Sequence, residues 1–321
     1  MYLVLAIIII GMFLVLLLLF VLCKYYNQAL QCEYYTVADA QLPVEFDGMR
    51  IVLISDLHEH QFGKENEKLL QRILEEKPDY VMIAGDLLIK GTHLRSDMVM
   101  GFLEKMCRKV PVYYAPGNHE EYLERECDEG VYEKYLSDLE KIGVKYLANQ
   151  TVEIEKNGQK LFVTGLHLQK KFFAKFYEKV SLQKEDIEEL LGEKRDGYEI
   201  LLAHNPTYFP VYSQWGANLV LSGHVHGGII ILPFVGGLIS TTYQLFPKYD
   251  FGKFQEGDAT MILSRGLGVH TIKVRLFNKP EITVITLQPP EMICRSERTR
   301  IRNSPFSSKR SSVLLANSSS R

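Results

Sequence analysis

Five short apolar runs, each followed directly by polar residues, constrain the fold of this chain more than any other feature of its sequence. The runs lie at 49–55, 80–84, 111–116, 200–203 and 219–222. They alternate with helical stretches such as 65–77 and 120–142, as expected of a layered α/β domain. Ligands of open α/β sheets gather beyond the carboxyl ends of the strands. We therefore expect the polar residues after these runs to meet at one sheet edge.

These polar residues form five motifs. They are Asp56-Leu57-His58, Gly85-Asp86, Gly117-Asn118-His119-Glu120, His204-Asn205-Pro206 and Gly223-His224-Val225-His226-Gly227-Gly228. Taken singly, most have an ordinary structural interpretation, such as a turn, a helix cap or an isolated histidine. The last is the most specific, because two imidazoles at i and i+2 of an extended segment point to one side. Since five of the nine histidines fall in these motifs, we interpret them together as a metal site.

The first 22 residues contain no charged side chain. At 1.5 Å per residue they would form a helix of roughly 33 Å, enough to cross a hydrocarbon core of about 30 Å. A cleavable signal peptide would have a basic start and a shorter apolar centre. The other alternative, a buried core helix, is disfavoured because this stretch is not amphipathic and lies at the extreme terminus. We therefore predict a transmembrane anchor over 1–22, a linker over 23–32 and single-pass attachment to the cell membrane through the lipid bilayer. Lys24 alone assigns the following domain to neither side.

The charge of the chain is nearly balanced, with a formal net value of −2. Residues 288–321 hold seven basic and two acidic residues, so the rest of the chain carries −7. This distribution argues against nucleic acid as a partner. We expect 289–321 to be a disordered, basic Ser- and Arg-rich tail, with contact to anionic lipid as the alternative. The five cysteines are dispersed without CxxC spacing, which argues against a disulfide framework and a thiolate zinc site.

The order of the five motifs resembles the calcineurin-like metallophosphoesterase superfamily. The likeness spans about residues 32–288, and we assign 33–288 to one metallophosphoesterase domain. Further details resemble the membrane-anchored bacterial branch, which includes UDP-2,3-diacylglucosamine hydrolases. These details are Phe62-Gly63, Asn66, Pro78-Asp79 and Ser264-Arg265-Gly266-Leu267-Gly268. The resemblance implies an α/β fold, a four-layer α/β/β/α sandwich of two mixed β-sheets preceded by one N-terminal transmembrane helix.

The resemblance also implies two divalent metal ions. Carried over position by position, the ligands of one ion are Asp56, His58, Asp86 and His226, and those of the other are Asp86, Asn118, His204 and His224. Asp86 would bridge the two. Each site then offers two nitrogen and two oxygen donors, a mixture that suits Mn, Fe, Co or Zn better than Ca or Mg.

The reaction implied by the resemblance is hydrolysis of a phosphodiester or pyrophosphate. Between two such ions a water loses a proton near neutral pH and attacks phosphorus in line. Besides the bridging Asp86, we predict His119 as a catalytic residue that protonates the leaving oxygen, with a hydrogen bond to a ligand carboxylate as the alternative. The remaining histidines match no ligand position, and among them we keep His60 as a candidate for substrate contact. They are His60, His93, His167 and His270.

Residues 229–239 form an unusually apolar stretch beside the paired histidines. We interpret them as a buried strand and turn, with an apolar wall for an acyl chain as the functional alternative. Together with the anchor, that alternative makes a lipid-linked or nucleotide-sugar phosphate a candidate substrate. A non-catalytic binding scaffold on the same fold and a nuclease are the other candidates. A scaffold would be expected to lack metal ligands, all of which are present here, and the charge of −7 argues against a nuclease.

Overall fold

The computed structural model describes residues 1–89, 96–127, 130–173, 180–228, 230–232, 234–240, 243–269 and 274–289. Of the tail expected over 289–321, only Pro289 lies within these residues. His93 and His270 also lie outside them.

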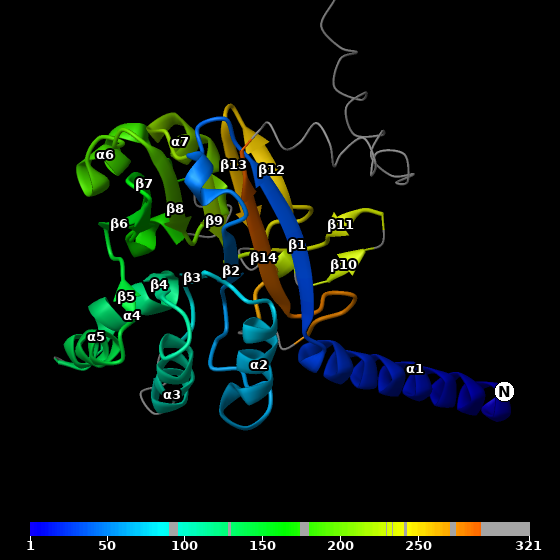
Figure 1. Ribbon diagram of the computed structural model, residues 1–321. Coiled ribbons are helices and arrows are strands. Elements are labelled where there is room, and N and C mark those ends of the chain that lie inside the picture. Colours follow the sequence, from blue (N-terminus) through cyan, green and yellow to red (C-terminus); the bar gives the residue numbers. More distant parts are fainter. Residues whose placement is uncertain are drawn as a thin grey trace, which may run out of the picture.

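Two six-stranded sheets form the centre of the molecule (Figure 1). The first contains, in spatial order, β1 (Gln31–Ala38), β14 (Glu281–Gln288), β2 (Arg50–Ile54), β3 (Tyr80–Ala84), β4 (Val112–Ala115) and β5 (Lys145–Tyr146). The second contains β12 (Gly252–Glu256), β13 (Ala259–Leu263), β9 (Leu219–Ser222), β8 (Tyr198–Ala203), β7 (Gln159–Leu166) and β6 (Gln150–Lys156). The pairs β14–β2, β12–β13 and β6–β7 are antiparallel and the other neighbours are parallel, so both sheets are mixed.

The two sheets pack face to face, and helices cover their outer faces. On the first sheet lie α2 (Glu67–Glu75), α3 (Ser96–Cys107) and α5 (Val131–Lys141), and on the second lie α6 (Lys184–Leu191) and α7 (Phe209–Trp215). Side chains of a strand alternate between its two faces. Along β2, Ile51 and Leu53 pack between the sheets, whereas Val52 and Ile54 pack against helices. The predicted four-layer α/β/β/α arrangement is therefore confirmed.

The helical stretch expected over 120–142 consists of two helices, α4 (Asn118–Glu126) and α5. Gly130 precedes α5 with a φ of 86°, a left-handed conformation that an uninterrupted α-helix does not contain. The stretch expected over 65–77 begins with the 3₁₀ turn η2 (Lys64–Asn66), which leads into α2. The other short elements are η1 (Val44–Phe46), η3 (Lys170–Phe173), η4 (Pro206–Tyr208), η5 (His226–Gly228), β10 (Ile231–Leu232) and β11 (Gly236–Gly237).

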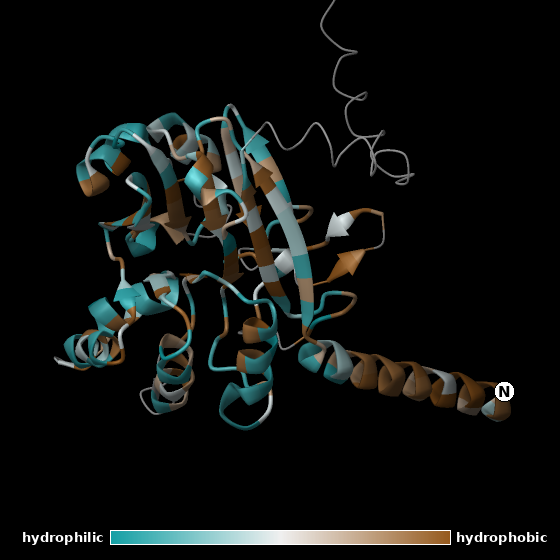
Figure 2. Ribbon diagram, in the orientation of Figure 1, coloured by the Kyte–Doolittle hydropathy of each residue, from teal (hydrophilic) through white to brown (hydrophobic). Residues whose placement is uncertain are grey.

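The helix α1 (Tyr2–Gln28) extends away from the two sheets and has no buried residue (Figures 1 and 2). Within the described part of the chain, it is the one helix long and apolar enough to cross a membrane by length and composition. A core helix of similar composition would be buried, and α1 is not. Residues 23–28, assigned from sequence to a linker, continue this helix, and β1 begins at Gln31.

The apolar stretch at 229–239 is not a buried strand and turn. Ile229 and Pro233 lie outside the described residues. The other residues of the stretch include the strands β10 and β11, which pair as a small hairpin. At the tip, Phe234 is 93% exposed and Val235 is 53% exposed. The interpretation of these residues as buried is therefore wrong, because the hairpin extends beyond the edge of the sheets instead of packing between them (Figure 1).

Candidate metal centre

The five polar motifs lie at one edge of the sandwich. The strands β2, β3 and β4 are parallel neighbours in the first sheet, and β8 and β9 are parallel neighbours in the second, so the carboxyl ends of each group lie together. A hydrogen bond joins the two sheets here, because the backbone N–H of His224 donates to the carboxylate of Asp56 at 3.0 Å. Residues 168 positions apart in sequence thus meet at this edge.

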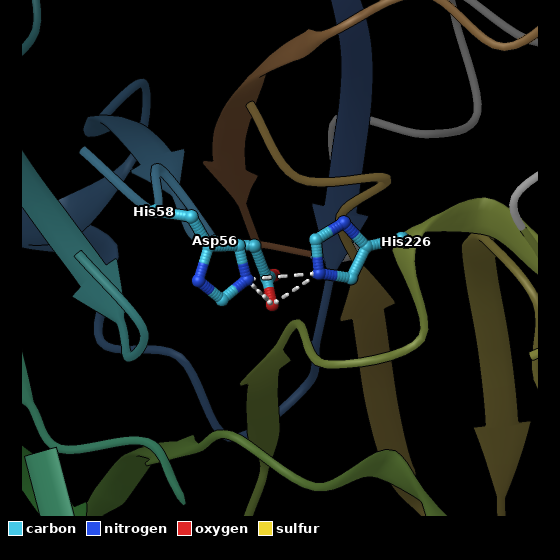
Figure 3. Close-up of side chains that lie close together, drawn as sticks. All are labelled: Asp56, His58 and His226. Carbon is cyan, nitrogen blue, oxygen red and sulfur yellow. Dashed lines mark hydrogen bonds and ion pairs between the residues drawn. The ribbon is translucent and has the colours of Figure 1, made fainter. Parts of the chain in front are cut away.

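A first cluster contains Asp56, His58 and His226, all of them buried (Figure 3). The Nε2 atom of His226 lies 3.3 Å from Oδ1 of Asp56, and that of His58 lies 3.8 Å from the same oxygen. The two imidazole planes are 8° from parallel, and their Nε2 atoms are 3.0 Å apart. Figure 3 shows both rings directing a nitrogen toward the carboxylate.

A second cluster contains Asp86, His204 and His224, whose candidate ligand atoms lie within 4.8 Å of one another. The Nε2 atom of His204 is 3.1 Å from Oδ2 of Asp86. The same Oδ2 lies 3.9 Å from Nε2 of His58, a member of the first cluster. Asp86 therefore lies between the two clusters.

Asn118 and His119 follow β4 at this edge. Among the described residues, no hydrogen-bond donor contacts the buried Oδ1 atom of Asn118. The backbone N–H of His119 donates to Oδ1 of Asp86 at 2.9 Å, and its ring lies edge-on to His58 with centroids 4.7 Å apart. His119, His58 and Asp86 also form a third group with metal-ligand spacing. All seven residues predicted as ligands thus come from this edge, with His119 beside them.

The other ring nitrogen of three of these histidines lies next to a backbone carbonyl. The Nδ1 atoms of His58, His204 and His226 are 3.3, 2.6 and 3.2 Å from the carbonyl oxygens of Leu88, Ala84 and Gly268, respectively. A carbonyl only accepts hydrogen bonds, so Nδ1 carries the hydrogen and a neutral ring presents the lone pair of Nε2. Lone pairs of nitrogen then face carboxylate oxygens, an arrangement that a cation stabilises. These residues fit bound metal.

The electrostatics of the cluster favour positive charge. Burial opposes ionisation of Asp86, but the neighbouring His204 and His119 hold its pKa well below the usual range. Burial lowers the pKa of His204, yet Asp86 and Asp56 outweigh it and raise that pKa to about 10. Nε2 of His204 therefore takes up a cation beside Asp86, a proton in the metal-free protein and a metal ion in the proposed site. At His224 burial dominates and lowers the pKa to about 3, so this imidazole keeps a lone pair at neutral pH. Burial likewise opposes ionisation of Asp56, but His226 and His204 hold its pKa below the usual range, so both carboxylates remain ionised although they are buried.

The backbone of the cluster is strained. Five of the predicted ligands have φ angles in the left-handed region, which residues other than glycine rarely adopt. They are Asp56 (51°), His58 (47°), Asp86 (57°), His224 (75°) and His226 (51°). Each such residue costs of order 1 kcal/mol or more, and residues of this kind cluster at functional sites. Strain at five positions of one cluster is therefore consistent with a functional centre.

Two glycines permit the close approach of the loops. A Cβ atom on Gly117 would overlap Oδ1 of Asp86, and one on Gly223 would overlap Oδ2 of Asp56. Each glycine directly precedes a predicted ligand. The small residue is needed because the backbone lies against the carboxylate of the other motif.

Glu120 belongs to the motif that follows β4, but no role was predicted for it from the sequence. In the structure Glu120 is fully buried, and its carboxylate accepts hydrogen bonds from the backbone N–H groups of Asp86, Leu87, Leu88 and Gly117 at 2.8 to 3.2 Å. It joins the loop after β3 to the loop after β4. Its position three residues after Gly117 is that of the acid in a capping box, which is the signal that predicts such a role.

Arg275, which contacts the same edge, was not predicted from the sequence. Its guanidinium is fully buried and donates to the carbonyl oxygens of Arg265, Gly266 and Gly268 at 3.0, 3.2 and 2.6 Å. The Gly268 carbonyl is also the one beside Nδ1 of His226. Arg275 thus holds the loop that orients His226, and no local pattern in the sequence identifies it.

Two of the remaining histidines lie outside the clusters. His60 donates from Nε2 to the carbonyl oxygen of Asn27 at 3.0 Å, and Nε2 of His167 is 3.4 Å from Glu124. Neither belongs to a group with metal-ligand spacing among the described residues. His60 does line a cavity of about 700 Å³ together with His58.

Comparison with known proteins gives the following relationships. A family model described as calcineurin-like phosphoesterase matches residues 49–228. The chain is 31% identical over 262 residues to the Bacillus subtilis protein named uncharacterized metallophosphoesterase YkuE, with 79% of this chain and 84% of that protein covered. It is 27% identical to a Danio rerio protein named transmembrane protein with metallophosphoesterase domain, and the match covers 78% of this chain and 57% of that protein. Among solved structures, the Mycobacterium tuberculosis phosphopantetheinyl hydrolase PptH gives a TM-score of 0.43 at 15% identity. The match covers 68% of this chain and 89% of that structure.

Proposed function

Because this chain belongs to the calcineurin-like phosphoesterase family and is a hydrolase of phosphoric esters, we propose that it is a membrane-anchored, dinuclear-metal hydrolase of a phosphodiester or pyrophosphate. The observation that carries this proposal is the position of Asp86 between two buried carboxylate–imidazole clusters. That geometry matches what a shared bridging carboxylate requires.

We assign one metal ion to Asp56, His58, Asp86 and His226, and the other to Asp86, Asn118, His204 and His224. Each set supplies two imidazole nitrogens and two oxygens, so we propose Mn, Fe, Co or Zn as the bound metals. When bound, two such ions supply Lewis acidity toward a phosphoryl oxygen and lower the pKa of water. The strained loops and their glycines hold the ligand atoms of the chain in place for them.

We propose that His119 donates a proton to the leaving oxygen. Its buried imidazole lies beside the proposed ligands, with Nε2 3.9 Å from Oδ2 of Asp86. The hydrogen bond from its backbone N–H to Asp86 fixes its position relative to the centre. A ring nitrogen of an imidazole can carry a proton and give it to an alkoxide or phosphate as the P–O bond breaks.

We propose that α1 anchors the protein in the cell membrane by a single pass. The helix has no buried residue, and the related Danio rerio protein is named a transmembrane protein. An anchored phosphoesterase has access to lipid-linked phosphates, and an acylated nucleotide sugar of the UDP-2,3-diacylglucosamine kind is one substrate to test. The scaffold and nuclease alternatives are not favoured, because the ligand residues are complete and the chain outside the tail is acidic.

The proposed activity is tested with bis(4-nitrophenyl) phosphate and the full-length protein. We expect release of nitrophenolate with added Mn, its loss in chelator, and its recovery when Mn is returned. A His167→Ala variant serves as a control, because His167 lies outside the clusters. A protein that binds Mn and hydrolyses neither this diester nor a pyrophosphate would contradict the proposal.

A further inference from the structure

A cavity of about 700 Å³ lies between α1 and the proposed metal centre. One wall is formed by the second half of α1 and includes Leu19, Phe20 and Cys23. The facing walls include His58, a proposed metal ligand, the apolar side chains of Ile89, Val269 and Val274, and the polar residues Glu59, His60 and Gln61. One cavity therefore joins the proposed centre to the helix that we propose spans the bilayer.

Specific contacts hold the end of α1 in this position. The carbonyl oxygen of Asn27 accepts a hydrogen bond from His60 at 3.0 Å, and the side chain of Gln28 donates to the carbonyl of Gln61 at 3.4 Å. The ring of Tyr26 lies edge-on to Phe277, with centroids 5.7 Å apart. Since His60 follows the ligand His58 by two residues, α1 is fixed to the same loop that supplies a metal ligand.

The apolar surface around this cavity continues beyond α1. Phe277 is 49% exposed, and its neighbour Leu276 forms a β-bridge with Ile230 at the base of the β10–β11 hairpin. The tip of that hairpin exposes Phe234 and Val235. Figures 1 and 2 show α1 and the hairpin extending from the same side of the molecule. Exposed apolar side chains gathered on one side are typical of a surface that contacts a membrane.

We propose that this cavity binds the hydrocarbon chain of a lipid phosphoester that enters from the bilayer, with α1 as one wall of the substrate site. The inference rests on the proposed phosphoesterase function and names its substrate class. Apolar side chains on both walls, next to polar residues and the proposed metal centre, favour an amphiphile. A soluble phosphoester would leave Leu19, Phe20 and Val274 without a substrate contact. In the hydrolysis, the oxygen of water bonds to phosphorus and the P–O bond to the leaving alcohol breaks. Phosphorus gains the hydroxyl group, and the leaving alcohol takes the other proton of the water.

Two phosphodiesters with the same leaving group test the proposal. The full-length protein in lipid nanodiscs with Mn is assayed with ethyl 4-nitrophenyl phosphate and hexadecyl 4-nitrophenyl phosphate. We expect kcat/KM to be about 100-fold higher for the hexadecyl ester, since burial of only part of the chain suffices for this preference. A Val274→Trp variant fills the cavity and should reduce the hexadecyl-to-ethyl ratio about tenfold. Val44→Trp is the matched control, because Val44 is 68% exposed and does not line the cavity.

Alkylation of Cys23 provides a measurement that does not depend on turnover. Hexadecylphosphonate should slow the reaction of Cys23 with N-ethylmaleimide about fivefold, whereas ethylphosphonate should not. Cys32 is the internal control, because it is a free cysteine on β1 and does not line the cavity. Protection of Cys23 should be lost in Val274→Trp; if that variant does not fold, Val269→Trp is used instead.

The outcomes separate this inference from the proposed function. Hydrolysis of both esters with equal kcat/KM, together with unprotected Cys23, would overturn the lipid site and leave the phosphoesterase function intact. Failure to hydrolyse either ester with any metal would contradict the phosphodiesterase function, while Cys23 protection would still support the lipid site.

Discussion

Asp86 and His119 are adjacent in space but should differ in what they contribute. Asp86 lies between the two clusters, so Asp86→Ala removes an oxygen ligand from both proposed coordination spheres. His119 belongs to neither proposed ligand set. We predict that Asp86→Ala loses bound metal and turnover, whereas His119→Ala keeps its metal and loses kcat by on the order of 10²-fold or more. Metal analysis of both purified variants beside kinetic assays checks this, and equal metal loss in the two would contradict the division of roles.

Glu281 is a buried carboxyl away from the clusters. It lies at the start of β14, where Oε2 is 3.3 Å from Nε of Arg265 and Thr283 donates to Oε1. Burial outweighs the nearby Arg265 and raises its pKa from 4.5 to about 7. A carboxyl whose folded-state pKa is raised favours folding in its neutral form, so that contribution is complete below about pH 4.5 and is lost as pH rises through about 7.

We therefore predict that the free energy of unfolding of the wild type, relative to Glu281→Gln, decreases by on the order of 3 kcal/mol between pH 4.5 and pH 8. The difference between the two proteins isolates Glu281, because other groups titrate in both. Denaturant unfolding at several pH values measures it. Parallel stability curves for the two proteins would show that Glu281 does not titrate with a raised pKa.

At the scale of elements, one carboxylate holds β3 and β4 together beyond the ends of the strands. Glu120, on the first turn of α4, accepts from four backbone N–H groups of the two loops. In Glu120→Gln, an amide NH₂ group would face backbone donors and leave some of them unsatisfied. We predict a loss of roughly 2–3 kcal/mol in the free energy of unfolding and weaker metal binding.

The matched control for this change is Glu124→Gln on the same helix, where the side chain of Glu124 is 47% exposed. Denaturant unfolding and metal titration of both variants measure the effect. We expect the control to resemble the wild type within about 0.5 kcal/mol. A Glu120→Gln variant as stable as this control would mean that the four hydrogen bonds do not hold the two loops.

Local patterns predict the elements of this fold better than their boundaries. The apolar runs before the motifs became β2, β3, β4, β8 and β9, because a buried strand requires apolar side chains on both faces. The stretch 120–142 divides because α4 ends at Glu126, where Cys127 is extended, and α5 begins after Gly130, whose left-handed backbone does not fit within a helix. The prediction that residues 229–239 are buried failed for a different reason. An apolar composition does not show whether a segment packs into the core or extends from the surface.

For the whole molecule, the proposed centre couples metal binding to stability. Ionised Asp56 and Asp86 are buried together, and metal that binds only the folded state stabilises it by mass action, about 4 kcal/mol per site at a thousandfold excess over Kd. We predict that a chelator lowers Tm and that added Mn restores it. Differential scanning calorimetry measures the shift, and Asp86→Ala should show none. Identical Tm values for the wild type with and without chelator would contradict a buried metal centre.

The resemblance to a known superfamily implied the four-layer arrangement and the set of seven ligands. The sequence by itself determined which residues follow strands at the sheet edge, a layered α/β class of fold and the existence of one uncharged apolar segment. Each depends on neighbours in the chain, such as an apolar run followed by Asp56 or the absence of charge over residues 1–22. Parallel strands then bring their carboxyl ends together, and so seven residues predicted as ligands lie at one edge.

Only the tertiary structure decided what surrounds that edge. Arg275 and Glu120 act through backbone groups of other loops, and α1 forms a cavity wall against the loop of His58. The hairpin tip at Phe234 is likewise exposed because of how the sheets pack beside it. These features arise from contacts between segments distant in the chain, and such contacts depend on packing geometry that local composition and periodicity do not encode.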